Sequence, residues 1–249
     1  MAEPTRPGSP IVFRYQFSFS NGDHKSFTVT LDPDTLQLMR PEPSTPPAWT
    51  RLRHSQCPNC PLNETQSPHC PAATSLIDVV DYFGRSRSIE QVEVRVETAE
   101  RDYVKRCALQ EAASSLIGLY MATSGCQVMA KLKPMARFHL PFSTLDETHY
   151  RVLSMYLLAQ YVAARRGQSP DWEFTTLVRL YEDVLTVNSH FFKRLASADL
   201  EDASLNAIVR LDSFAGSIAF TVDQQILDEL DRLFDAYLER PGERGPAAS

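Results

Sequence analysis

Three cysteines within one polar stretch are the residues of this sequence best suited to chemistry. Cys57 and Cys60 are separated by two residues, and Cys70 follows after nine more. A C-x2-C pair forms a turn that lets both sulfurs reach one cation, and Cys70 adds a third ligand after a short loop. Residues 50–72, which we call the knuckle, are rich in proline and poor in apolar side chains. Because such a segment cannot form a helix or a central strand, we expect a metal ion to fix its shape.

The fourth ligand must come from outside the three cysteines. Cys126 is the first candidate, because it directly follows a predicted helix end, where a flexible turn can aim a thiolate. His69 and His54 are the possible substitutes, although His69 would point away from its cysteine neighbour in an extended chain. Cys107 opens an apolar helical pattern, so we expect it to be structural.

Zinc is the cofactor that this ligand set predicts first, because structural zinc sites commonly join one C-x2-C pair to distant ligands. Four thiolates equally suit an iron–sulfur cluster, which stays as the alternative. A metal-free interpretation also stays open, since free cysteines are among the most buried residues. The C-x2-C pair matches thiol–disulfide oxidoreductases too, but the helix that lowers the pKa of the first cysteine in those enzymes is missing here.

A second stretch, residues 133–141, contains the candidate ligand-binding residues Arg137 and His139. They are two residues apart, so both would emerge on one face of an extended segment, as an anion or substrate site requires. The alternative is that His139 bonds a backbone carbonyl between its apolar neighbours. No catalytic residue is predicted, because the sequence contains no HExxH, P-loop, GxSxG or GxGxxG motif.

Composition limits the classes of function. The chain has 249 residues, 43% of them apolar, which is enough for a sizeable core. Its formal net charge of −6, without any basic block, argues against a nucleic-acid partner. The sequence lacks both a signal peptide and an apolar run long enough for a membrane span, so we expect a cytoplasmic protein with no membrane partner. In that compartment thiols stay reduced, which favours a metal site over disulfides.

Four strands are predicted in the first half of the chain. Residues 11–19 alternate between apolar and polar side chains, Asn21-Gly22 supplies the positive φ of a tight turn, and residues 26–31 return as the second strand. Val92 to Val96 alternates with charged residues, and residues 102–106 should return antiparallel to it. We expect all four strands to form one antiparallel sheet.

Helical periodicity dominates the rest of the chain. Thr144 and Glu147 form a capping box, and Ser169-Pro170 should open the following helix. The fold class is therefore α+β, with a small antiparallel sheet and the knuckle followed by a multi-helix array. The expected units are a disordered tail (1–10), an α+β region (11–140), a helical region packed with it as one unit (141–239) and a second tail (240–249). Helices are predicted at about 76–83, 108–123, 144–166, 169–195, 200–214 and 222–238.

Several short motifs resemble a known family. The sequence contains CPNCPL, HCP, SGC and PMARFHLPF, together with YLLAQY and a later DW. These resemble an uncharacterised bacterial family known as a domain of unknown function, and the likeness spans the chain from the first hairpin to the last helix. The resemblance implies a bacterial cytoplasmic origin and carries over no activity, catalytic residue or partner.

The residues together predict a zinc-stapled adaptor or regulatory interaction protein that binds another protein. A metal-dependent enzyme with a pocket near Arg137 and His139 is the first alternative, since three cysteine ligands alone would leave a zinc position open for substrate. An iron–sulfur redox sensor is the second alternative. The sequence predicts no oligomeric state.

Overall fold

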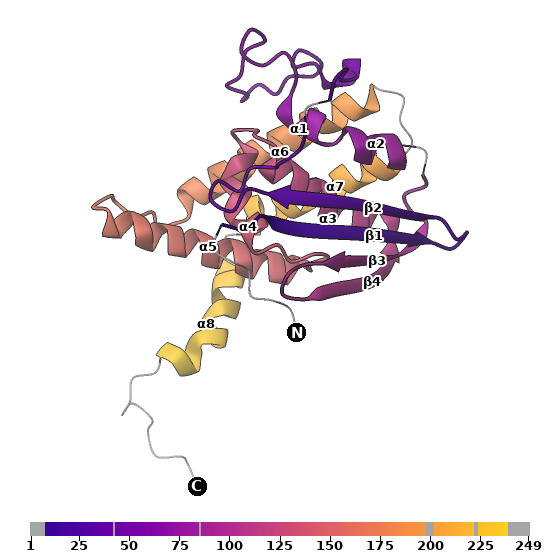
Figure 1. The fold of residues 1–249 in the computed structure, drawn as a ribbon. Coiled ribbons are helices and arrows are strands. Elements are labelled where there is room, and N and C mark those ends of the chain that lie inside the picture. Colours follow the sequence, from indigo (N-terminus) through magenta and orange to yellow (C-terminus); the bar gives the residue numbers. More distant parts are fainter. Residues whose placement is uncertain (1–7, 42, 85, 198–201, 222–223, 239–249) are drawn as a thin grey trace.

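Four strands form one antiparallel sheet in the order β2-β1-β3-β4, as predicted (Figure 1). The computed structural model describes residues 8–41, 43–84, 86–197, 202–221 and 224–238. The strands are β1 (Ile11–Phe19), β2 (His24–Leu31), β3 (Gln91–Glu97) and β4 (Asp102–Ala108).

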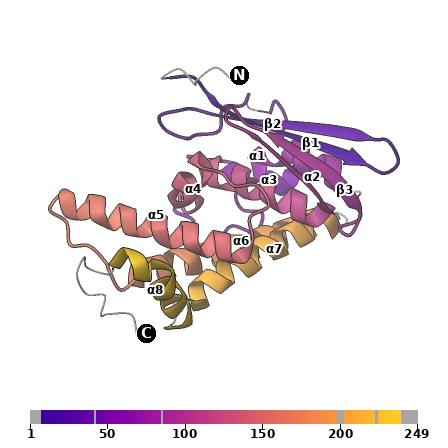
Figure 2. The same cartoon turned by 90° about the horizontal axis from the view of Figure 1, so that it is seen from below.

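One face of the sheet is apolar and is covered by helices. Tyr15 of β1 lies opposite Val96 of β3, and Phe17 lies opposite Val94, so these alternating side chains share one face. All four are buried, and Phe17 packs edge-on against Phe83 of a covering helix at a centroid distance of 5.0 Å. Seen from below, the sheet lies along one side of the helices (Figure 2). The period-2 pattern thus identified both the strands and the buried face.

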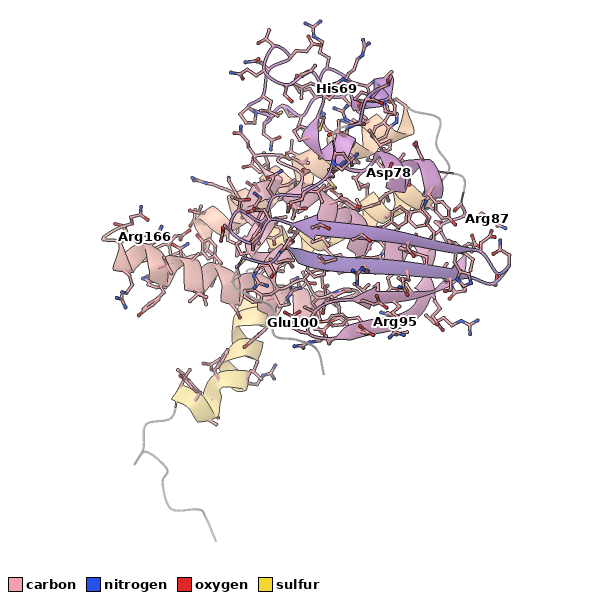
Figure 3. The ribbon with its side chains drawn as sticks, viewed as in Figure 1. His69, Asp78, Arg87, Arg95, Glu100 and Arg166 are labelled. Atoms are coloured by element: carbon pink, nitrogen blue, oxygen red, sulfur yellow. The ribbon has the colours of Figure 1, made fainter. Side chains whose placement is uncertain are left out.

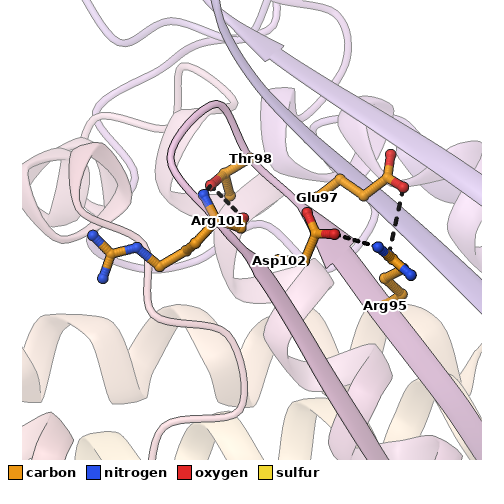
Figure 4. A network of polar contacts seen from close by, with 5 residues as sticks. All are labelled: Arg95, Glu97, Thr98, Arg101 and Asp102. Carbon is orange, nitrogen blue, oxygen red and sulfur yellow. Dashed lines mark hydrogen bonds and ion pairs between the residues drawn. The ribbon is translucent and has the colours of Figure 1, made fainter. Parts of the chain in front are cut away.

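Each of the two hairpin turns is stabilised by residues within the turn itself. Gly22 lies at the tip of the β1–β2 hairpin with φ of 90°, so the predicted turn is confirmed. At the β3–β4 turn, the Thr98 hydroxyl accepts from the Arg101 backbone N–H at 3.1 Å and donates to its carbonyl at 2.7 Å. Beside it, Arg95 pairs with Asp102 across the two strands (Figure 4). The pair is exposed, so it contributes little to stability.

Helices form layers behind the sheet. α3 lies between the sheet and α7, and α7 packs in turn on α6. One apolar core runs continuously from Phe13 in β1 to Ile218 in α7. No helix among the described residues is long and apolar enough to cross a membrane. The helices and 3-10 turns are η1 (Ala48–Thr50), α1 (Pro71–Ser75), α2 (Ile77–Phe83), α3 (Leu109–Thr123), η2 (Met129–Leu132), α4 (Lys133–Arg137), α5 (Leu145–Arg165), α6 (Thr175–Ala196), α7 (Asp202–Thr221) and α8 (Gln224–Leu238).

The capping box at the start of α5 is confirmed. The Thr144 backbone N–H donates to the Glu147 carboxylate at 2.7 Å, and the Glu147 N–H donates to the Thr144 hydroxyl at 3.2 Å. The start of α6 was predicted wrongly, since the helix begins at Thr175 and not at Ser169. The carboxylate of Asp171 accepts the N–H groups of Thr175 (3.3 Å) and Thr176 (2.6 Å), which holds the preceding residues in a turn.

Other boundaries also differ from those predicted. α7 extends to Thr221, beyond the predicted end at residue 214. Cys107 is buried on β4, opposite Val92, and does not open a helix. Of the predicted tails, residues 1–7 and 240–249 lie outside the described residues.

Candidate metal centre

Backbone hydrogen bonds shape the knuckle around its cysteines. The Cys60 N–H donates to the Cys57 carbonyl at 3.0 Å, which closes the tight turn expected of a C-x2-C pair. At the base of the knuckle, the Cys70 N–H donates to the Thr50 carbonyl at 2.8 Å. The two ends of the segment are therefore held side by side, and Cys70 directly precedes α1.

Four cysteines from two distant parts of the chain line one small pocket. Cys57, Cys60 and Cys70 come from the knuckle, and Cys126 comes from the turn after α3. All four are half-buried and free of disulfides. The pocket, which we call the cysteine pocket, has a volume of about 20 Å³, roughly the room that one water molecule or one ion needs.

The turn that brings Cys126 into the pocket depends on a glycine. Gly125 has φ of 98°, and a Cβ there would lie 3.1 Å from the side-chain nitrogen of Gln37, so both conformation and space favour glycine. Beyond it, the backbone N–H groups of Val128 and Met129 donate to the Cys126 sulfur. Such N–H donors stabilise a thiolate and orient a metal-ligating sulfur.

Burial in the pocket favours the neutral thiol form of Cys57 and Cys126, because it raises the pKa of both. Burial raises the pKa of Cys57 to about 12, and the nearby Cys70, Cys126 and Cys60 add to the effect. Burial also raises the pKa of Cys126 despite its two N–H donors. A cation would therefore have to displace protons on binding. The side chains line the pocket without forming a closed shell, since no group of three or more His, Cys, Asp or Glu within the described ranges is already arranged as metal ligands.

The two histidines considered as substitute ligands lie outside the cysteine pocket. His69 Nδ1 is 2.8 Å from the Thr50 hydroxyl oxygen, and the residue lies in the knuckle (Figure 3). His54 Nε2 is 2.6 Å from the hydroxyl oxygen of Ser197, on the exposed side. Each imidazole is already hydrogen-bonded elsewhere, so Cys126 is the residue that the fold brings to the other three.

A buried arginine of α6 holds the knuckle in place. Arg194 is only 2% exposed, and its guanidinium donates to the carbonyls of Trp49 (2.7 Å), Arg51 (2.6 Å) and Leu52 (3.3 Å). It forms no ion pair with any residue that the structure describes. Burial lowers the pKa of Arg194, whereas the charges that Cys70, Cys57 and Cys60 can carry act to raise it. The guanidinium of Arg194 therefore lines the cysteine pocket, and deprotonated cysteines there would stabilise its positive charge.

A second bond from α6 reaches into the C-x2-C turn itself. The Asn59 side-chain amide donates to the carbonyl oxygen of Asp183 at 3.1 Å and to its carboxylate at 3.0 Å. Arg194 and Asp183 are both on α6, so this helix positions the turn and the knuckle base together.

The expectation that Arg137 and His139 share one face of an extended segment was wrong. Lys133–Arg137 forms the short helix α4, because residues after Pro134 continue the turn begun by η2. Arg137 is exposed and lies over the ring of Phe138. His139 instead lines a larger cavity between α3 and α7, to which Arg137 does not contribute.

His139 is held as a neutral imidazole. Its Nε2 lies 2.5 Å from the Tyr15 hydroxyl oxygen, which in turn lies 2.8 Å from the Ser115 hydroxyl oxygen. Its ring packs edge-on against Phe13. Burial, with a smaller contribution from the charge of Arg151, lowers the pKa of His139 to about 3. Its partner is therefore a buried tyrosine, where the sequence suggested a backbone carbonyl.

Sequence reasoning missed the polar residues that α6 contributes. Arg194 and Asn188 both lie on the apolar stripe of this helix, at helical spacing from Phe191, and both are almost fully buried. Polar residues on an otherwise apolar stripe are the signal that could have found them, because a buried polar group needs a specific partner.

Replacing Arg194 by Met should destabilise the protein strongly. Three carbonyls, two of them in part-buried hydrogen bonds and one in a buried bond, would lose the Arg194 donor, so we expect the free energy of unfolding to fall by about 3 kcal/mol or more. Denaturant unfolding of Arg194→Met measures this. The control is Arg179→Met, which removes an exposed arginine from the same helix. Equal stability of the two variants would contradict the role assigned to Arg194.

His139 should make stability depend on pH. Its folded-state pKa lies below its ordinary value of 6.5, so the unfolded chain binds a proton that the folded chain does not between about pH 6.5 and pH 3. This contribution is therefore complete above pH 6.5 and is lost as pH falls, by up to roughly 1.4 kcal/mol per pH unit. His139→Gln should lose less stability than the parent between pH 7 and pH 4.5. His24→Gln, an exposed control on β2, should follow the parent.

The chain as a whole is similar to one known protein family. No curated protein and no solved structure matches it. A family model described as "Domain of unknown function (DUF6901)" matches residues 13–235, from the first strand into the last helix. The chain therefore belongs to this family, as the motif resemblance predicted.

Proposed function

We propose that the protein is a zinc-stapled interaction protein of the bacterial cytoplasm, an adaptor or regulator that binds a protein partner. The observation that supports it best is the convergence of Cys57, Cys60, Cys70 and Cys126 on one pocket with room for a single ion. A reducing compartment keeps such thiols available for a metal.

The donor set suits zinc. Four thiolates in a tetrahedral shell make a closed structural site, and small rotations of half-buried cysteine side chains would complete it. The N–H donors on Cys126 and the buried cation of Arg194 would stabilise the negative charge of such a centre. Zinc bound this way contributes roughly 10 kcal/mol or more in small folded sites, enough to order a segment with little apolar surface.

The size of the pocket favours this structural role over the two alternatives. A volume of about 20 Å³ suits one ion better than an iron–sulfur cluster or a metal with bound substrate. The cavity that contains His139 shares no lining residue with the cysteine pocket, so a metal there would not face a substrate in that cavity. A metal-dependent enzyme near Arg137 and His139 and an iron–sulfur sensor therefore rank below the structural site.

The outer half of α5 supports the interaction role. This helix projects from the body of the molecule, and Arg166 follows it at its far end (Figures 1 and 3). Leu158 and Tyr161 are 64% and 54% exposed there, and Trp172 after the helix is 52% exposed. Exposed aromatic and aliphatic side chains gathered on one element are typical of protein interfaces, and the net charge of −6 favours a protein over a nucleic-acid partner.

Metal content tests the first half of the proposal. Elemental analysis of reduced, purified protein should find about one equivalent of zinc, and Cys126→Ser should lose most of it. Chelation should raise hydrogen exchange in residues 50–72 and around Gly125, while the middle of α6 stays protected. Cys107→Ser is the matched control and should keep its zinc. Less than about half an equivalent of any transition metal, or zinc retained in Cys126→Ser, would contradict a closed four-cysteine site; absorption near 400 nm would instead identify a cluster.

Partner capture tests the second half. Leu158→Glu should abolish recovery of a partner that co-purifies from the native host with the parent protein, because a charge would be buried at the interface. Val104→Glu places the same charge on the exposed side of β4 and should leave recovery unchanged. If the parent protein, Leu158→Glu and Val104→Glu all recover the same proteins, α5 is not the interface.

A further inference from the structure

An apolar cavity lies between α3, α6 and α7, away from the cysteine pocket. We call it the inner cavity; its volume is about 180 Å³. That is somewhat more than the ~150 Å³ cavity that accommodates benzene in an engineered protein core. Its wall is mostly aliphatic, with Leu119, Met129 and Ile218 among the residues that form it. A single ring with a short chain therefore matches the space.

Two polar atoms in the wall have no partner. The Asn188 residue is 1% exposed, and its side-chain oxygen makes no hydrogen bond with the described part of the chain. The Nε–H of Arg210 is likewise buried and unpaired. Leaving such groups unsatisfied costs about 1–3 kcal/mol each, so a cavity that keeps both an acceptor and a donor is built for a polar ligand group.

The charges around the inner cavity favour an anion. Arg151 and Arg210 both line it, whereas the one carboxylate among the described lining residues, Glu111, is already paired with Lys105 at 2.6 Å. Arg151 is partly occupied, since it donates to the carbonyl of Phe138 at 2.7 Å. Arg210 lies over the face of Phe214, with its guanidinium carbon 5.7 Å from the ring centroid, and it forms no ion pair with any residue in the described ranges. Its guanidinium is the group available to a ligand.

Arg210 lines both the inner cavity and a neighbouring hollow. A second hollow of about 400 Å³, beside Lys105 and Ser213, shares five lining residues with the inner cavity: Glu111, Phe142, Ser143, Arg210 and Phe214. Lys105 and Glu111 pair with each other here, so the cation of this hollow without a carboxylate partner among the described residues is Arg210. Electrostatic attraction at Arg210 and an apolar interior suit a molecule with one charged end.

We propose that the inner cavity binds a small aromatic or branched aliphatic carboxylate that also carries a hydroxyl or amino group. The carboxylate accepts from Arg210, the hydroxyl or amino group donates to the side-chain oxygen of Asn188, and the apolar body lies against the wall formed by α3 and α7. His139 also lines this cavity, and because its imidazole is neutral it adds no positive charge there. The site is independent of the cysteine pocket.

A matched series of compounds tests the proposal by isothermal titration calorimetry. The parent protein should bind 3-phenyllactate, bind 3-phenylpropanoate about 10-fold more weakly because the hydroxyl is absent, and bind 3-phenylpropanamide more weakly still because the charge is absent. 4-Methyl-2-hydroxypentanoate distinguishes an aliphatic from an aromatic body. No binding of either hydroxy acid at millimolar concentration would overturn the proposal.

Two variants assign the contacts. Arg210→Met should lower the affinity for 3-phenyllactate at least 10-fold and erase the preference over the amide, whereas Arg179→Met, which removes an exposed charge on α6, should bind as the parent does. Asn188→Leu should erase the preference for the hydroxy acid over 3-phenylpropanoate. Circular dichroism confirms that each variant is folded before titration. Unchanged affinity in a folded Arg210→Met protein would overturn the assignment.

Discussion

The buried guanidinium of Arg194 joins α6 to the base of the knuckle, a segment with few apolar side chains to pack. The knuckle cannot pack as a helix or a strand, and of the three carbonyls that Arg194 binds at its base, only that of Arg51 also accepts from a backbone N–H within the described residues, that of His54 at 3.0 Å. Arg194 supplies donors to all three from a rigid helix, so the entry of the knuckle is fixed relative to α6. The turn that contains Cys57 and Cys60 is bound to the same helix by the hydrogen bonds from Asn59 to Asp183. Without these bonds, the segment would have to be ordered by a metal alone.

α6 contributes one buried polar side chain to the cysteine pocket and another to the inner cavity. Val187 and Arg194 wall the cysteine pocket, while Val184 and Asn188 wall the inner cavity. Arg194 and Asn188 are six residues apart, roughly 9 Å along a helix, so one rigid element positions both. Their neighbours on the stripe are apolar, which ties the orientation of the polar groups to the packing of the core. The packing of the core and the walls of both hollows are therefore formed by the same face of one helix.

Sequence patterns predicted the parts of this structure that depend on local periodicity. The four strands and their buried face came from the alternation around Tyr15 and Val94, and the hairpin tip came from Gly22. The convergence of Cys126 with the knuckle was also suggested by its place after a helix end. What the sequence could not supply were long-range pairings, such as Arg194 with the carbonyls of the knuckle or Tyr15 with His139. Those depend on how the layers meet, and a side chain on a periodic stripe does not show which distant backbone it will contact.

Charge balance links the arginine to the proposed zinc. A divalent ion with four thiolates carries a net negative charge, and burying such a charge is costly unless a cation lies close by. Arg194 lies beside the cysteines, and its own burial without a carboxylate partner among the described residues is also costly. Loss of the protons on metal binding would thus relieve both costs at once. Because lysine would offer a point charge without the planar fork that serves three carbonyls, arginine is the side chain that can meet the structural and the electrostatic requirement together.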